Sequence, residues 1–242
     1  TSLTDSNGDL LFEVIDLQDN EDWFYLKTRN LLQIDTRNVR LNFTLNNSPS
    51  YIPENNIKRL ISKDGTIDLD FLRDLVAKRG SEIALISVMH SNNEIGALQP
   101  IDEVIQIAGD IPLHSDAIQS LLKVPVSFKG LTALSISAHK VGGPVGVGAL
   151  VLKRGLDIPA LLHGGGQERE IRSGTLNAPA ICAFAAALTD YPSQTVTKLR
   201  DMLIEGIKNS IPGVLINTPA NSLPGIVNVS FPGTKGETLL LL

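Results

Sequence analysis

The chain has 242 residues, and its 21 basic and 26 acidic side chains give a formal net charge of −5. An acidic chain lacks the positive surface of a general nucleic-acid binder, and the single Cys182 excludes an intramolecular disulfide framework or a multi-thiolate metal site. No apolar run approaches the roughly 18 residues of a membrane span, and the first residues do not open a signal peptide. We therefore expect a soluble, cytoplasmic globular protein without a nucleic-acid or membrane partner.

The first 50 residues differ from the rest of the chain. They hold eight acidic and four basic residues, which is −4 of the total −5. Apart from a candidate strand at 10–15, they show no clear periodicity. We assign residues 1–56 to an atypical N-terminal segment.

From residue 57 onward, short apolar runs alternate with helical patterns. Strands are predicted at 83–89, 111–114, 133–137, 147–152 and 160–162, with an alternating strand at 227–231. Helices are predicted after Pro100 over 101–108, over 178–188, and where Val196, Leu199, Leu203 and Ile207 share one face. Strands separated by helices indicate an α/β fold with a mainly parallel sheet flanked by helices.

Polar and glycine-rich segments follow four of these predicted strands. They are His90–Glu94, His114–Gln119, Ser137–Lys140 with Gly142-Gly143-Pro144 behind it, and His163–Gln167. Ligands of such sheets bind beyond the carboxyl ends of the strands. We therefore interpret the four segments as one site.

Lys140 is the most informative residue of this group. A lysine between an apolar strand and a Gly-Gly-Pro turn is expected to be partly buried, which lowers an amine pKa as a Schiff-base lysine requires. Taken alone, a solvated loop lysine is the more common case. Asp116 has a similar alternative, because an acid at a strand end more often caps a helix.

Two further patterns have weaker interpretations. Gly164–Gly166 permits close backbone approach to an anion, but a glycine triplet is usually a turn, and no Gly-Lys-Ser/Thr follows to make it a P-loop. Four histidines recur at 24, 25 and 24 residues, namely His90, His114, His139 and His163. A metal site on them is a minor alternative, because no His-Glu-x-x-His pair is present. We expect no metal.

These motifs together resemble the pyridoxal-phosphate-dependent cysteine desulfurases of the class-V aminotransferase superfamily. The resemblance rests on residues 88–96, on His114-x-Asp116-Ala117-x-Gln119, on Ser135–Lys140, and on 163–169 with 172–175, in the family's order and spacing. It runs from about residue 57 to 242. It implies an aspartate-aminotransferase-like fold of type I, with the cofactor-binding core of the large domain at 57–190 and the beginning of a small C-terminal α+β domain at 191–242.

The resemblance also implies roles for individual residues. Lys140 matches the lysine that holds the cofactor and moves protons at the substrate carbon, and Asp116 matches the acid facing the pyridine nitrogen. Gln119 and Asn93 match residues near the phenolic oxygen of the cofactor, with Asn93 also near the substrate carboxylate. The matched phosphate ligands are Ser137, His139 and, supplied across a homodimer, Thr175.

Two departures from the family qualify this expectation. The family's nucleophilic cysteine lies on a loop after a segment matched here by 236–242, where the printed sequence stops, and Cys182 is expected to be a packed core thiol. We also find no match in 1–56 to the family's phosphate loop or to the histidine that stacks on the cofactor.

The expected chemistry is removal of sulfur from L-cysteine to give L-alanine and a persulfide for iron–sulfur cluster or thio-cofactor assembly, with a sulfur acceptor or iron–sulfur scaffold protein as partner. We expect the chain as given not to complete that cycle. The alternatives are a non-catalytic scaffold or degenerate homologue, and a selenocysteine lyase or aminotransferase of the same fold.

Overall fold

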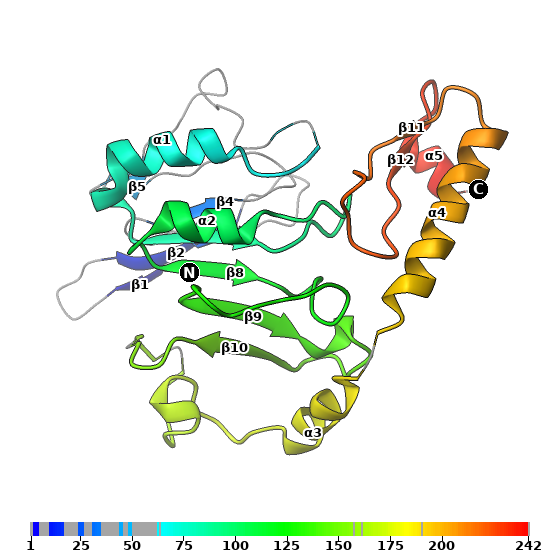
Figure 1. Cartoon of the computed structure of the whole chain (residues 1–242). Helices are drawn as coiled ribbons and strands as arrows, with labels where there is room; N and C mark the ends of the chain where they lie inside the picture. Colours follow the sequence, from blue (N-terminus) through cyan, green and yellow to red (C-terminus); the bar gives the residue numbers. More distant parts are fainter. Residues whose placement is uncertain are drawn as a thin grey trace. The chain divides into compact units, whose positions relative to one another are not determined.

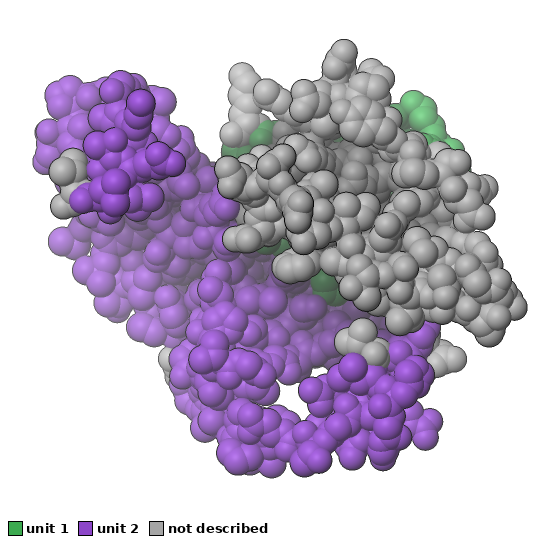
Figure 2. Space-filling model, turned by 180° about the vertical axis from the view of Figure 1, so that it is seen from behind, with its two compact units in different colours: residues 1–89, 100–114 green, residues 90–99, 115–242 purple. Residues whose placement is uncertain are grey.

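The computed structural model describes residues 2–4, 10–16, 24–26, 31–34, 44–45, 48–49, 62, 64–156, 158–160, 162–189 and 191–241. These residues form two compact units, one of residues 1–89 with 100–114 and one of residues 90–99 with 115–242, which Figure 2 colours separately. The helix and strand order is shown in Figure 1.

Among the described residues, the first unit contains seven strands and two α-helices. It also contains the first two residues of β8 (Leu113–Asp116). The strands are β1 (Ser2–Thr4), β2 (Leu10–Asp16), β3 (Phe24–Leu26), β4 (Leu31–Ile34), β5 (Thr44–Leu45), β6 (Ser48–Pro49) and β7 (Leu85–Met89). The helices are α1 (Leu69–Arg79), followed by the 3-10 turn η2 (Gly80–Glu82), and α2 (Ile101–Ala108). Strands β1, β2 and β3 form a small antiparallel sheet, and β5 pairs with β6.

Helices α1 and α2 lie beside each other and contribute to the apolar core of the first unit (Figure 1). Asp68 caps α1 by accepting the amide hydrogen of Phe71 at 2.9 Å. Core side chains come from both helices, from β7 and from β8: Leu72, Leu75, Ile86, Val88, Val104, Ala108 and Leu113. Since these positions repeat every three to four residues in helices and every two in β7, the apolar pattern alone orients the elements.

The second unit begins with the turn 90–99 and the end of β8 (Leu113–Asp116). It continues through β9 (Ala133–Ser137), η3 (Ala138–Lys140), β10 (Gly148–Leu152), η4 (Glu168–Glu170), α3 (Ala178–Ala187), α4 (Ser193–Ser210), β11 (Leu215–Ile216), β12 (Val229–Ser230) and α5 (Gly236–Leu240). Its most buried apolar residues include Ala97, Ala117, Leu134, Ala138 and Leu223.

The main sheet has five strands in the order β10-β9-β8-β7-β4. Residues 31–34 of β4 run parallel to 85–88 of β7, while 148–152 of β10 run antiparallel to 133–137 of β9. The sheet is therefore mixed and mainly parallel, as expected from the sequence.

Most predicted elements are confirmed, including the helix at 101–108 and the strand at 133–137 with their bounds. The predicted strand at 160–162 is not formed: Leu162 makes an isolated bridge with Arg172, and Leu161 lies outside the described residues. The predicted domain boundaries stay predictions. No helix in the described part of the chain is long and apolar enough to cross a membrane.

Candidate functional site

The turn that follows β7 is fixed by its own hydrogen bonds. Asn92 is only 1% exposed, and its Oδ1 accepts the amide hydrogens of Glu94 and Ile95 at 2.8 and 2.9 Å. The amide of His90 donates to the carbonyl oxygen of Asp116 at 2.7 Å. The polar residues after β7 are thereby held next to the last residue of β8.

A buried pair of serines ties this turn to the segment after β8. The hydroxyls of Ser91 and Ser120 lie 2.6 Å apart, and these residues are 1% and 0% exposed. Buried hydroxyls are costly unless they are paired, so this contact fixes the separation of the two segments. The amide of Ala117 also donates to the carbonyl of Ser135 in β9, at 3.0 Å. The ends of β8 and β9 and the turn after β7 are thus joined within one unit.

Asn93 lies in this turn with an unsatisfied polar atom. Its Oδ1 is buried and has no hydrogen-bond partner among the described residues. An unpaired buried acceptor of this kind costs about 1–3 kcal/mol. A ligand relieves that cost by donating to Oδ1 or, after the amide rotates by 180°, by accepting from Nδ2. Asn93 therefore fits a polar ligand group such as the predicted cofactor presents.

Asp116 and Gln119 project from the end of β8 and the turn after it. Oδ1 of Asp116 accepts the amide hydrogen of Ile118 at 2.9 Å, which leaves Oδ2 as an acceptor for a protonated ring nitrogen. Oε1 of Gln119 accepts a hydrogen bond from Nζ of Lys123 at 3.1 Å. The local capping alternative for Asp116 and the cofactor role are therefore compatible, because they use different oxygens.

Lys123 is half-buried beside these residues. Burial, and secondly the positive charge of Lys140, lower the pKa of the Lys123 amine below its ordinary value of 10.5.

The turn after β9 carries the remaining predicted residues at this end of the sheet. Ser137 Oγ lies 2.8 Å from His139 Nδ1, so the two predicted phosphate ligands contact each other. Lys140, the last residue of η3, is exposed, which corrects the expected partial burial. The reason is local: within η3 only Ala138 is buried, and the chain then turns away through Gly142 and Gly143.

Gly143 makes that turn possible. Its amide donates to the carbonyl oxygen of Ala138 at 2.9 Å. A Cβ at this position would lie 2.9 Å from the Ala138 Cβ and 3.0 Å from its carbonyl oxygen. A side chain would therefore force apart the backbone that supports Lys140.

Thr175 lies in the exposed segment between η4 and α3, and its role across a homodimer stays a prediction. The glycine-rich segment before it folds back on Ser173, whose Oγ accepts the amide hydrogen of Gly166 at 3.3 Å. Within the described residues, no three histidine, cysteine, aspartate or glutamate side chains converge as metal ligands. Cys182 is exposed on α3, which corrects its expected packing in the core, because Phe184 is the buried side chain of that helix.

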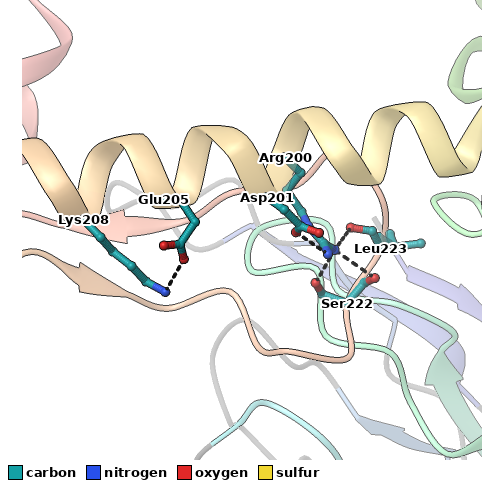
Figure 3. A network of polar contacts seen from close by, with 6 residues as sticks. All are labelled: Arg200, Asp201, Glu205, Lys208, Ser222 and Leu223. Carbon is teal, nitrogen blue, oxygen red and sulfur yellow. Dashed lines mark hydrogen bonds and ion pairs between the residues drawn. The ribbon is translucent and has the colours of Figure 1, made fainter.

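A C-terminal loop contacts the turn after β7. The amide of Leu223 donates to the carbonyl oxygen of Gly96 at 2.8 Å, and a Cβ on Gly96 would lie 3.2 Å from the Ile226 Cβ. Arg200 of α4 holds this loop: its Nη1 donates to Ser222 Oγ at 2.9 Å and to the carbonyls of Ser222 and Leu223 at 3.4 and 3.3 Å (Figure 3).

Sequence reasoning missed Lys123, Arg200 and the pair Ser91–Ser120. The spacing of Gln119 and Lys123 by four residues was the one available signal. The other contacts join residues 22 to 29 positions apart, and no local pattern marks them.

Comparisons with known proteins agree on a family. The class-V aminotransferase family matches residues 56–242. A cysteine desulfurase IscS of Dictyoglomus turgidum is 40% identical over 192 residues, covering 75% of this chain and 48% of the relative. The NifS-like protein of Rickettsia africae has a similar structure, with a TM-score of 0.68 and 31% identity over 75% of this chain and 53% of that one. SspA in complex with cysteine is also similar, with a TM-score of 0.62 and 33% identity over 71% of this chain and 49% of that one. The chain spans about half the length of the curated relatives it matches. Its matched region covers most of the sequence, and the chain belongs to the class-V aminotransferase family, with cysteine desulfurases among its relatives.

Proposed function

We propose that the protein is a cysteine desulfurase that binds pyridoxal phosphate through Lys140 and acts on L-cysteine. One observation carries the proposal: Asn93, Asp116, Gln119 and the 137–140 turn occur together in one compact unit, at segments joined by the bonds described above. The relatives named cysteine desulfurase and the complex of SspA with cysteine support L-cysteine as the substrate.

When bound, pyridoxal phosphate supplies an electron sink for the carbanion that forms at the substrate α-carbon. Oδ2 of Asp116 would hold the proton on the ring nitrogen, since an adjacent carboxylate favours the cationic form. The amide of Gln119 would donate to the phenolic oxygen. Ser137 and His139 would bind the phosphate, and Nζ of Lys140 would move the proton at the α-carbon.

The test of this proposal is cofactor trapping. Pyridoxal phosphate is added to the purified protein, the linkage is reduced with borohydride, and the labelled peptide is mapped. We expect the label on Lys140, loss of the absorbance band in Lys140→Ala, and no loss in Lys153→Ala, which removes another exposed lysine. A label that persists in Lys140→Ala would overturn the assignment.

Substrate choice is tested on the same complex. L-cysteine is expected to change the absorbance spectrum of the bound cofactor. At the same concentrations, L-serine, which lacks the sulfur, is expected not to give the same final spectrum. Equal spectral changes with both amino acids would contradict L-cysteine as the preferred substrate.

The proposal extends to the assembly in which the protein works. We infer a cytoplasmic homodimer in which Thr175 of one protomer contacts the phosphate bound by the other, and a protein that accepts the sulfur for iron–sulfur or thio-cofactor assembly. The IscS name of several relatives supports the iron–sulfur connection. Sedimentation with and without pyridoxal phosphate tests the dimer, and Thr175→Val should weaken cofactor binding only if the dimer forms.

A further inference from the structure

Lys123 lies against the candidate site without a role in the proposed chemistry. Its side chain is half-buried and its Nζ lies 3.1 Å from Oε1 of Gln119. An ammonium group is rarely buried without a reason, because burial costs hydration energy. The lowered pKa of Lys123, caused first by burial and then by Lys140, records that cost.

The backbone on both sides of this side chain is fixed. The amide of Lys123 donates to the carbonyl of Ser120 at 3.0 Å, and its own carbonyl accepts from Oγ of Ser193, the first residue of α4, at 2.9 Å. Leu122, directly before it, has a φ of 63°, in the left-handed region that side chains rarely adopt. Such a conformation persists only where surrounding contacts enforce it. The position of Lys123 is therefore determined by several independent contacts.

The chemistry of the contact fixes the orientation of the Gln119 amide. A lysine ammonium has three donors and no acceptor, so the group that faces it must be the amide oxygen. The amide oxygen and nitrogen lie on opposite sides of the group. With Oε1 held by Lys123, the two hydrogens of Nε2 remain for an acceptor elsewhere.

We propose that Lys123 is a positioning residue of the cofactor site, which holds the amide of Gln119 so that Nε2 donates to the phenolic oxygen of the cofactor. This inference rests on the proposed function, because it assigns that cofactor to the site. Lys123 acts through Gln119 and is not itself required to touch the cofactor.

The first test needs no cofactor. In the cofactor-free protein, the nitrogen and hydrogen NMR signals of the Gln119 side-chain amide are followed in the wild type and in three variants. We expect Lys123→Met to shift these signals, Lys123→Arg to restore them because guanidinium is also a pure donor, and Lys129→Met, an exposed lysine nearby, to leave them unchanged. Signals that do not respond to Lys123→Met would overturn the inference.

The second test uses the protein loaded with pyridoxal phosphate. Lys123→Met should still be labelled on Lys140 by borohydride, but bind the cofactor about tenfold more weakly, which corresponds to one hydrogen bond of roughly 1.4 kcal/mol. The pH midpoint of the absorbance band should move upward, because removal of a nearby cation favours protonation. Lys123→Arg should restore both properties.

A double-mutant cycle separates this role from a general structural one. If Lys123 acts by holding Gln119, Lys123→Met should weaken cofactor binding little further in a Gln119→Leu background. Additive losses would contradict the positioning role. If the wild type is not labelled on Lys140, the proposed function fails, while the NMR comparison still decides the contact between Lys123 and Gln119.

Discussion

Arg200 offers a quantitative test of how the C-terminal loop is held. Its side chain is 10% exposed, and Arg200→Met keeps the aliphatic stem while removing the guanidinium. The short bond is the one from Nη1 to Ser222 Oγ at 2.9 Å; the two carbonyl contacts, at 3.4 and 3.3 Å, are weaker (Figure 3). A hydrogen bond to a charged donor contributes about 1.5–3 kcal/mol. We therefore expect local destabilisation of about 2–3 kcal/mol.

The ion pair with Asp201 should add little to this loss. The Asp201 side chain is 56% exposed at 2.8 Å from Nη2, and exposed pairs contribute about 0–1 kcal/mol. Lys208 and Glu205 form a similar pair on the same helix, at 3.1 Å with both partners exposed. Asp201→Asn and Lys208→Met therefore serve as matched controls, each expected to cost less than about 0.5 kcal/mol.

The assay is hydrogen exchange of the backbone amide of Leu223, which donates to the carbonyl of Gly96. A loss of about 2–3 kcal/mol speeds exchange by opening of this loop roughly 30- to 150-fold. Hydrogen exchange is preferred here because it reports on the opening of this loop alone, whereas urea unfolding averages over a larger part of the chain. The reasoning would be refuted if Arg200→Met exchanged at the rate of Lys208→Met.

Three further predictions address the backbone and charge of the second unit. Gly143→Ala should lower the free energy of unfolding by about 1–3 kcal/mol through the contact with Ala138, and should reduce labelling of Lys140. Gly206→Ala in α4 is the control: no atom lies near its added Cβ, so it should stabilise the protein by about 0.5–1 kcal/mol in urea unfolding. Arg169 is exposed and has a φ of 57°, a left-handed conformation that strains a residue with a side chain, so Arg169→Gly should stabilise the protein by about 0.5 kcal/mol. Glu205→Gly in the helical α4 should instead destabilise it by about 1 kcal/mol. Opposite signs would contradict the strain at Arg169. The pKa of Lys123 is lowered in the folded state, so the unfolded chain binds more protons between that pKa and 10.5. The free energy of unfolding should therefore rise with pH in this range. Lys123→Met should lose that rise in urea titrations between about pH 8 and 10.5.

The sequence predicted the order of elements better than the course of individual strands. Proline at position 100 and the apolar period placed α2 correctly. The strand predicted at 111–114 instead runs from Leu113 to Asp116, because backbone pairing continues through polar residues, as the bond from His90 to Asp116 shows. Hydropathy reports burial and not hydrogen bonding, so it ends a strand where the side chains become polar.

The same limitation explains the two wrong burial predictions. Lys140 was expected to be partly buried and Cys182 to pack in the core because their neighbours are apolar, yet both are exposed. An apolar helix such as α3 has no polar side to orient it, so its sequence does not specify which residues face the core. By contrast, the roles predicted for Asp116 and Gln119 rest on their motif in the chain and not on burial, and they stay predictions.

Stability and chemistry are assigned to different residues of this site. Asn92, Ser91 and Ser120 are buried and satisfy one another or the backbone, so removing one of them leaves an unpaired polar group and is expected to destabilise the turn. Lys140 is exposed, so Lys140→Ala should change stability by less than about 0.5 kcal/mol. A variant that loses cofactor labelling without losing stability therefore reports on the chemistry of the site, and Lys140→Ala is the variant expected to give that result.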